Sequence, residues 1–248
     1  MIATPAWPPR STPRLFVPDT LSLGARVVLD ADASHYVAHV MRLGEGAPLL
    51  LCDDDTGEWR ATIEEVRKKA VSLTVEEQLR PREPVPDLWL LVAPVRRARF
   101  EWLVEKATEL GVDRIVPVLT RRSVVDRVKP ERLAAIAREA AEQCARTALP
   151  QIADARPLED ALDDWPSSRA LYFADETGGA TALTAFAAGP ASAAILIGPE
   201  GGFDPAERAQ ILAHPAAIGI GLGPRILRAE TAAIAAATLW TAVDDARD

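Results

Sequence analysis

The chain has few cysteines and no long apolar run, and each absence excludes a class of protein. Cys52 and Cys144 are the only cysteines in 248 residues, so a disulfide framework is excluded and a reducing cytoplasm is the expected location. The apolar runs are short, as in residues 88–95, whereas a membrane-spanning helix needs about 20 apolar residues. Residues 1–13 are rich in proline, lack the apolar core of a signal peptide and are expected to form a disordered lead-in. We therefore expect a cytoplasmic protein with no membrane partner.

An excess of basic charge is also missing. The net charge is −8, whereas nucleic-acid-binding domains are often basic. The charge is uneven, because residues 1–130 hold 19 Lys and Arg against 19 Asp and Glu, while residues 131–248 hold 9 against 17. Basic clusters stand out in the neutral half, at residues 67–69, 80–82, 96–99 and 121–122. Each cluster alone is best explained as solvated surface, but together they allow a local basic face in that half.

Two parts of the chain differ in their pattern. Residues 14–80 alternate short apolar runs with turns, which predicts a small β-rich barrel or sheet with one helix over residues 33–41. Three prolines within residues 81–86 then predict a stiff linker over residues 81–87. From residue 88 strands and helices alternate, which predicts a mainly parallel α/β sheet. Two domains are therefore expected, over residues 14–80 and 88–248.

The predicted elements can be given by range. In the first part, strands are expected over residues 14–17, 25–29, 48–52, 58–63 and 70–75. In the second part, strands are expected over residues 88–93, 114–119, 170–174, 193–198 and 218–222, and helices over residues 100–110, 130–147, 205–213 and 229–243. Asp204 is the predicted N-cap of the helix that begins at Pro205. The last helix is apolar on nearly every side, so it is expected to be buried all round, with a subunit interface as one way to cover it.

Two segments near the C-terminus each run from an apolar strand through a Gly and Pro loop into a helix. They are residues 195–203, ILIGPEGGF, and residues 219–232, GIGLGPRILRAETA. In open α/β sheets, ligands bind at the edge where such loops lie, and glycine lets a ligand approach the backbone amides. A tight connecting turn explains either loop taken alone. The pattern is not the G-x-G-x-x-G fingerprint, which argues against a nicotinamide enzyme.

Three other features have simpler explanations. His35 and His39 are spaced to share a helix face but lack a third ligand, so no metal site is expected there. Residues 53–55 lack the rest of a calcium-binding loop and are expected at a solvated hairpin tip. Cys144 has no neighbouring histidine and is interpreted as a packing residue.

Several motifs together resemble a known family. They are RLFV at residues 14–17, HVMRLGEG at 39–46, EKATELGV at 105–112, EQCAR at 142–146 and the two glycine loops. In this order and spacing, nearly the whole chain resembles the RsmE family of 16S ribosomal RNA uridine-N3 methyltransferases, of the SPOUT superfamily. The resemblance implies an N-terminal PUA-like β-barrel domain that binds RNA and a C-terminal SPOUT α/β domain with a trefoil knot. It also implies a homodimer, S-adenosyl-L-methionine as cofactor, and 16S ribosomal RNA of the small subunit as partner.

The resemblance also assigns roles to residues of this sequence. The cofactor is expected to lie on two sets of residues, Leu196, Ile197, Gly198, Pro199, Glu200, Gly201 and Gly202 from the first loop, and Leu222, Gly223, Ile226 and Leu227 from the second. Contacts with RNA are expected from Arg14, Arg42 and Arg225.

Arg228 and Glu230 are the candidate catalytic residues. A uridine must lose the proton on N3 before methylation, which needs a base or cations that stabilise the charge on O2 and O4. Arg228 suits the second role, and Glu230 or Glu200 suits the first. The simpler alternative is that Arg228 and Glu230 pair to cap the last helix.

Two other functions stay open at this point. The first is a SPOUT methyltransferase that acts on transfer RNA, and the second is a non-catalytic RNA-binding or ribosome-assembly factor. The intact pair of glycine loops favours an enzyme, and the resemblance over the full length favours ribosomal RNA.

Overall fold

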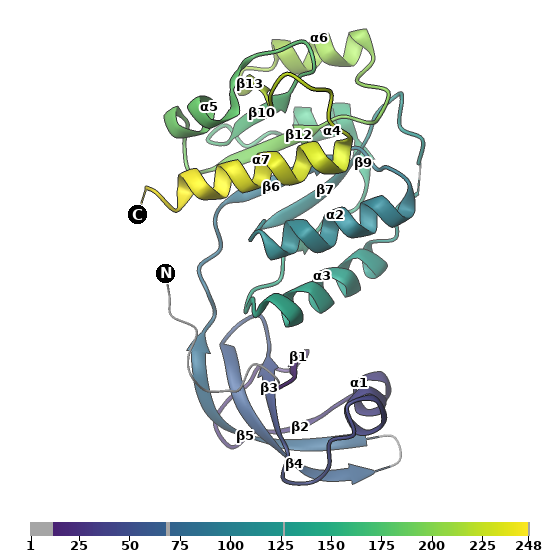
Figure 1. Ribbon diagram of the computed structural model, residues 1–248, viewed down its shortest axis with the longest axis vertical. Coiled ribbons are helices and arrows are strands. Elements are labelled where there is room, and N and C mark those ends of the chain that lie inside the picture. The colour runs from purple at the N-terminus through teal and green to yellow at the C-terminus, as the bar shows by residue number, and fades with distance from the viewer. Residues whose placement is uncertain (1–11, 68–69, 126, 248) are drawn as a thin grey trace. The chain divides into compact units, whose positions relative to one another are not determined.

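The computed structural model describes residues 12–67, 70–125 and 127–247, which form two compact units (Figure 1). Unit 1 comprises the chain up to Pro84 together with Ala141–Ala148, and unit 2 comprises Val85–Ala140 and Leu149–Asp248. Most of the predicted lead-in, and Lys68 and Lys69 of one basic cluster, lie outside the described residues.

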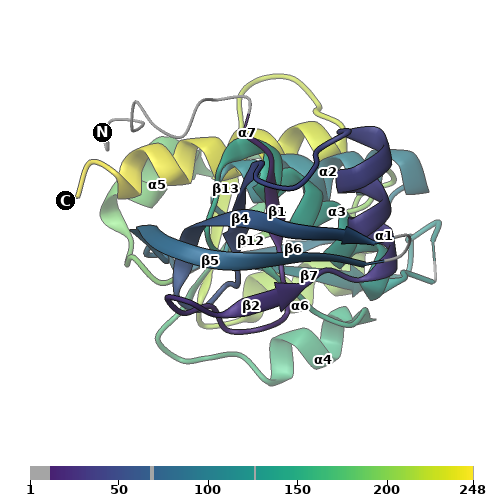
Figure 2. The ribbon, with the colours of Figure 1, turned by 90° about the horizontal axis from the view of Figure 1, so that it is seen from below.

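Unit 1 is built around a five-stranded sheet. Its elements are β1 (Arg14–Phe16), β2 (Arg26–Val28), α1 (Ala31–His35), the π-helical η1 (Tyr36–Val40), β3 (Pro48–Cys52), β4 (Gly57–Arg67) and β5 (Ala70–Pro81). The strand order is β1-β3-β4-β5-β2; β1 and β3 are parallel, and the other neighbouring pairs are antiparallel. Figure 2 shows β4 and β5 side by side, with β2 along the outer edge of β5. Register shifts between β4 and β5 bend the sheet around its apolar core.

The hairpin tip between β3 and β4 is organised by Asp53. Its carboxylate accepts hydrogen bonds from the backbone of Leu21 and Thr56 and from the Thr56 hydroxyl. The predicted hairpin tip is confirmed, and its first acidic side chain is a structural acceptor. Strands β4 and β5 are longer than predicted, because their outer ends are polar and pair with each other beyond the apolar core.

Residues 141–148 belong to unit 1, although residues 141–144 are the last residues of a helix whose earlier part belongs to unit 2. The Arg80 guanidinium donates to the carbonyl oxygen of Ala145 (2.9 Å), and Glu83 accepts from the backbone amide of Thr147 (3.0 Å). Ala145 has a φ of 65°, which a helix does not accommodate. The helix α3 (Pro130–Cys144) therefore ends three residues before the predicted Thr147.

Unit 2 holds an eight-stranded sheet in which every pair is parallel. Its strands are β6 (Leu88–Val92), β7 (Arg114–Leu119), β8 (Gln151–Ile152), β9 (Arg156–Pro157), β10 (Ala170–Ala174), β11 (Ala180–Thr181), β12 (Ala193–Ile197) and β13 (Ala217–Gly221). The order is β11-β13-β10-β12-β6-β7-β8, and β9 pairs with β7. The predicted parallel α/β sheet is confirmed.

Helices cover both faces of this sheet. Its helices are α2 (Arg97–Glu109), α3, α4 (Leu158–Asp163), α5 (Ala182–Ala188), α6 (Pro205–Ala213) and α7 (Ala229–Asp244). One apolar core contains side chains of α2, α3, α5 and α7, and the other contains side chains of α4 and α6. Strand β12 serves both cores, because Ile195 and Ile197 belong to the first and Ala194 and Leu196 to the second.

Two helices of unit 2 begin where the loops after β12 and β13 end. Helix α6 begins with the predicted N-cap Asp204, which forms a capping box with Glu207. Helix α7 is buried along much of its length and places Trp240 in the core. Among the described residues no helix has the length and apolarity to cross a membrane. The trefoil knot and the dimer that the resemblance implies stay predictions.

Candidate functional site

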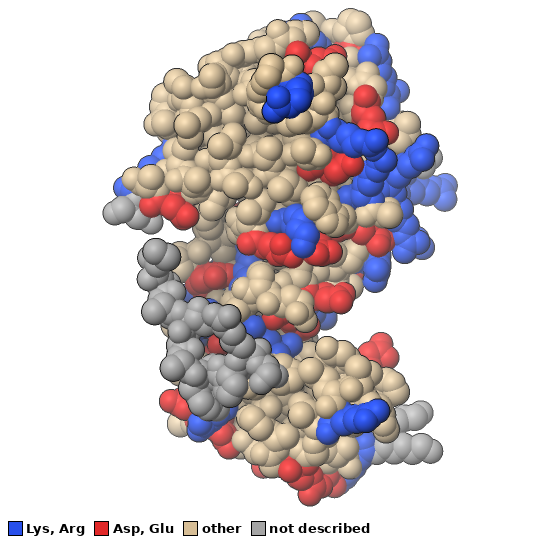
Figure 3. All heavy atoms as spheres, viewed as in Figure 1, with Lys and Arg blue, Asp and Glu red and all other residues tan. Residues whose placement is uncertain are grey.

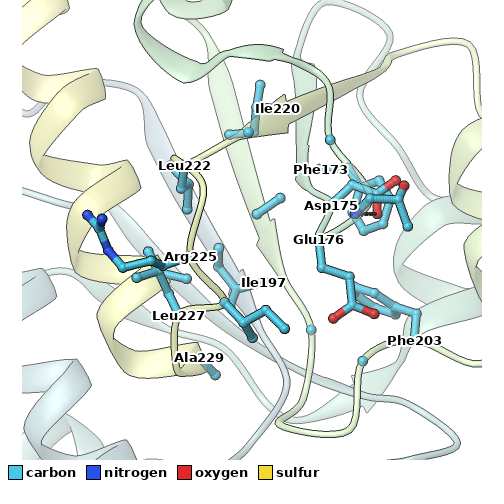
Figure 4. A pocket seen from close by; sticks show the side chains of 18 of the residues that line it. Phe173, Asp175, Glu176, Ile197, Phe203, Ile220, Leu222, Arg225, Leu227 and Ala229 are labelled. Atoms are coloured by element: carbon cyan, nitrogen blue, oxygen red, sulfur yellow. Dashed lines mark hydrogen bonds between the residues drawn. The ribbon is translucent and has the colours of Figure 1, made fainter.

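Three loops meet where the carboxyl ends of β10, β12 and β13 lie together. These strands are neighbours in the order β13-β10-β12, so the loops that follow them come from one edge of the sheet. They enclose a cavity of about 310 Å³. In Figure 4, one side carries Ile220, Leu222, Leu227 and Ala229, and the other carries Phe173, Asp175, Glu176 and Phe203. The site expected from two glycine loops is therefore built from three.

Most of the predicted cofactor residues line this cavity. They are Ile197, Gly198, Pro199, Glu200, Gly202, Leu222, Gly223, Ile226 and Leu227. Two predicted residues do not line it. Leu196 points into the core that α4 and α6 cover, because alternate residues of β12 face opposite sides of the sheet. Gly201 lies on the loop but outside the cavity wall, and its carbonyl oxygen accepts a hydrogen bond from Arg122 (2.8 Å).

Glycine is required at two positions of the cavity wall. A Cβ atom on Gly198 would lie 2.6 Å from the ring of Phe203, which packs edge-on against Phe173. Gly223 has a φ of 109°, a conformation that residues with a side chain rarely adopt. The first glycine allows the β12 loop to close on the aromatic pair, and the second sets the path of the β13 loop.

The loop after β10 supplies the residues that the sequence analysis missed. Asp175 is buried and receives the Arg208 guanidinium at 2.5 Å. Burial works to raise the pKa of Asp175, but hydrogen bonds from Arg208 and Thr177 outweigh it and hold the pKa below its ordinary value. Glu176 points toward the loop of Phe203 (Figure 4), and its Oε1 would lie 3.3 Å from a Cβ atom on Gly202. A strand followed by Asp-Glu-Thr-Gly-Gly was the signal that would have identified this loop.

Arg99 contacts both the loop after β12 and the start of α7, which follows the loop after β13. Its Nη1 donates to Oε1 of Glu200, in the loop after β12, and its Nε lies 3.6 Å from Oε1 of Glu230, in the first turn of α7. Only 11% of the Glu230 side chain is exposed. Its Oε2 is buried and has no hydrogen-bond partner among the described residues. Arg99 therefore provides the positive charge that compensates a nearly buried carboxylate next to the cavity.

Arg228 occupies the N-cap position of α7 and is exposed. Among the described residues its side chain makes no capping hydrogen bond, and Glu230 pairs with Arg99 instead. The alternative of an Arg228–Glu230 pair that caps the helix is therefore wrong. Neither side chain lines the cavity, although Ala229 between them does.

Comparisons with known proteins identify the family of this chain. Residues 81–241 match the model of an RNA methyltransferase domain, and residues 29–76 match an RNA methyltransferase PUA domain. The ribosomal RNA small subunit methyltransferase E of Bacillus subtilis is 32% identical over 214 residues, which cover 80% of this chain and 82% of that protein. The chain belongs to the ribosomal RNA small subunit methyltransferase E family.

Solved structures support the same family and fold. A methyltransferase of Legionella pneumophila in complex with the bound cofactor SAM has a TM-score of 0.86 and 30% identity, over 93% of this chain and 97% of that one. The methyltransferase E of Neisseria gonorrhoeae bound to S-adenosyl methionine has a TM-score of 0.81 and 27% identity, over 91% and 95%. The predicted fold class, a PUA-like domain followed by a SPOUT-type α/β domain, is confirmed.

The predicted RNA-binding residues of this family member have different surroundings. In unit 1, Arg14 donates to Glu58 (2.5 Å) and to the carbonyl oxygen of Glu142 (3.0 Å), and Glu58 also receives Arg80 (3.1 Å). The Arg14 side chain is therefore paired with the buried carboxylate of Glu58. Arg42 is exposed and has a φ of 56°. In unit 2, Arg225 lines the cavity, but its side chain extends away from it in Figure 4.

The remaining candidates of the sequence analysis do not form a further site. The rings of His35 and His39 lie 4.9 Å apart, and no group of three potential metal ligands occurs among the described residues. Cys144 is exposed, so its interpretation as a packing residue is wrong. Burial raises the pKa of Cys52 to about 12. These placements leave the cavity in unit 2 as the site with a chemical interpretation.

Proposed function

We propose that this chain methylates ribosomal RNA of the small subunit with S-adenosylmethionine, at N3 of a uridine. The observation that carries the proposal is the cavity formed by the loops after β10, β12 and β13, in a chain whose family is ribosomal RNA small subunit methyltransferase E. Relatives of known structure bind S-adenosyl methionine. The choice of uridine and of its N3 atom rests on the family resemblance of the sequence motifs.

The residues of the cavity fit this cofactor. Gly198 makes room for Phe203 and Gly223 carries no side chain, so backbone groups of both loops line the cavity and can approach a ligand. Leu222 and Leu227 offer apolar surface to the adenine ring, and Glu176 offers a carboxylate to a polar or cationic group. Bound there, S-adenosylmethionine supplies an activated methyl group, so the chain contributes placement and charge.

Arg228 is the residue that we assign to charge stabilisation. It is exposed at the end of the loop that lines the cavity. We infer that a uracil ring bound beside the cavity contacts its guanidinium. Negative charge grows on O2 and O4 as the N3 proton leaves, and a cation placed there lowers the barrier. Glu230 is less suited to be the base than the sequence suggests, because only 11% of its side chain is exposed, against 39% for Glu200. Glu200 is the predicted base that lines the cavity.

A turnover assay tests the roles of these residues. Arg228→Ala is expected to keep cofactor affinity and to lose about 100- to 1,000-fold in single-turnover rate on saturating RNA, because electrostatic donors of this kind contribute about 2.7–4 kcal/mol. Arg228→Lys is expected to recover part of the rate, since an ammonium lacks the fork of a guanidinium. Arg156→Ala, a partly exposed arginine of unit 2 that does not line the cavity, is the control. Near-normal turnover in Arg228→Ala would remove this residue from the mechanism.

Mapping of N3-methyluridine tests the function itself. Ribosomal RNA from cells without this protein is expected to lack one such nucleotide in the small subunit, and the purified protein is expected to restore it. Restoration in transfer RNA instead would favour the alternative substrate, and binding without transfer would favour the non-catalytic factor. The predicted homodimer and cytoplasmic location belong to this proposal, and light scattering of the purified chain tests the dimer.

A further inference from the structure

Exposed basic side chains gather on unit 2 around the starts of α2 and α3. Figure 3 shows Lys and Arg side chains together on one side of this unit. They come from the start of α2, the loop after β7 and the start of α3. We call this set the basic surface, and its members are Arg96, Arg97, Arg121, Arg122, Arg127, Lys129 and Arg132.

Side-chain contacts hold two parts of the basic surface in place. Arg97 (2.7 Å) and Arg132 (3.5 Å) both contact Glu101, so the first turns of α2 and α3 lie together. Arg121 pairs with Asp204 at 3.1 Å, and Arg122 donates to the carbonyl oxygen of Gly201. Both of these contacts are on the loop that follows β12. The basic surface therefore reaches the loop that forms one wall of the cavity.

The charges of this surface are available to a partner. The side chains of Arg97, Arg121 and Arg132 are 80%, 66% and 51% exposed. Exposed ion pairs of this kind contribute about 0–1 kcal/mol, so a polyanion can replace the carboxylate partners at little cost. The described acidic residues among them are Glu101, Glu131, Glu200 and Asp204, and Asp126 of the same stretch lies outside the described residues. Cations outnumber them, although the whole chain carries a net charge of −8.

We propose that the basic surface binds the phosphate backbone of the substrate RNA beside the methyl-transfer cavity. The proposal rests on the proposed function and locates the RNA on unit 2. Arginine predominates in the set, and its planar guanidinium pairs with two phosphate oxygens at once. Phosphate contacts of this kind set the position of an RNA without reading its sequence. Arg14, in contrast, is already held by a buried carboxylate of unit 1.

The salt dependence of RNA binding tests this assignment. The variant Arg97→Gln/Arg121→Gln/Arg132→Gln removes three cations from the basic surface. The probe is small-subunit ribosomal RNA transcribed in vitro, bound to the full chain over a range of salt concentrations. The slope of log affinity against log salt is expected to fall by about 2 to 3, since each phosphate contact contributes about 0.7 to 0.9. The same three positions changed to Lys are expected to keep most of the slope.

A matched variant removes the same charge elsewhere. Arg26, Arg114 and Arg156 carry exposed or half-exposed side chains with polar partners, and they lie outside the basic surface and the basic clusters of the sequence. Their triple change to Gln is expected to leave the slope nearly unchanged. Equal slopes for the two Gln variants, or a wild-type slope in the Arg97, Arg121 and Arg132 variant, would overturn the proposal. The same holds if that variant loses binding to acidic proteins of the subunit while RNA binding is unaltered.

Cofactor binding separates this proposal from the proposed function. Calorimetry with S-adenosylhomocysteine is expected to give the same affinity in the wild type and in both Gln variants, because none of the six side chains lines the cavity. Wild-type protein that binds RNA but no cofactor would refute the proposed function alone. Wild-type protein that binds cofactor and methylates RNA, with no change of slope in the first variant, would refute the basic surface alone.

Discussion

Replacing Arg99 by Gln removes the cation that lies between Glu200 and Glu230. The loss at Glu200 is expected to be small, because both side chains of that pair are more than a third exposed, and such pairs contribute about 0–1 kcal/mol. The loss at Glu230 is expected to be larger, because this carboxylate is nearly buried and one of its oxygens has no other partner among the described residues.

The separation of charges gives the magnitude. At 3.6 Å and an effective dielectric constant of about 20, a pair of unit charges interacts by about 5 kcal/mol. Arg99 is 35% exposed, so solvent screens part of this attraction. Removal of one partner of a fully buried pair costs about 3–5 kcal/mol, and we expect about 1–3 kcal/mol here. The loss should appear where Glu230 lies, as easier local opening of the first turns of α7.

Hydrogen exchange of the α7 amides measures this local free energy of opening. The double-mutant cycle uses Arg99→Gln, Glu230→Gln and the combined variant. Arg97→Gln is the control, because Arg97 lies on α2, the helix that carries Arg99. The neutral amide introduced by Glu230→Gln needs no cation, so Arg99→Gln should cost little in that background. An equal cost of Arg99→Gln in both backgrounds would refute the reasoning, because the effect would then not pass through the Glu230 carboxylate.

Three further predictions concern glycine, cysteine and aspartate positions. Gly223→Ala is expected to weaken cofactor binding. Gly24→Ala, at a glycine of unit 1 that also has a positive φ and does not line the cavity, is expected to cost about 1–3 kcal/mol of stability and leave calorimetric affinity unchanged. At pH 8 a thiol reagent is expected to label Cys144 in the native protein and Cys52 only after denaturation, because burial raises the pKa of Cys52 to about 12. Asp175→Asn is expected to destabilise unit 2 at neutral pH. Because the pKa of Asp175 is lower in the folded protein than in the unfolded chain, its ionised carboxylate stabilises the fold at pH values above the unfolded pKa. The free energies of unfolding of variant and wild type, measured by urea titration, should therefore converge as the pH falls through the folded pKa.

Local signals explain which parts of the fold were predictable. Helix α6 has both bounds as predicted, because Asp204 and Pro205 mark its start by their own chemistry. The strands β3, β7 and β10 were also predicted with their observed bounds, since each is a compact apolar run. The short elements β8, β9, β11, α4 and α5 were missed, because two to seven residues carry too little periodicity to detect.

The rest depends on contacts between distant residues. The end of α3 was misplaced because Ala145 takes a positive φ while Arg80 binds its carbonyl oxygen, and neither fact is written in the local sequence. Arg99 and Glu230 lie 131 positions apart on different helices, so no spacing rule connects them. Arg14 was predicted to contact RNA because a sequence does not distinguish an exposed arginine from one that is paired with a buried carboxylate.

The strand order of unit 2 has a consequence for folding kinetics. In unit 1, β3, β4 and β5 pair as successive neighbours along the chain. In unit 2, Leu88 of β6 pairs with Ala193 of β12, and α7 then packs on both strands. Bringing strands together that are so far apart in the sequence costs chain entropy before their contacts can offset that loss. Sheets of this kind therefore form slowly. The cavity needs the ends of β10, β12 and β13 together, so we expect it to be among the last features to form during folding. A ligand that binds there therefore stabilises the completed state and slows unfolding, without speeding the early steps of folding.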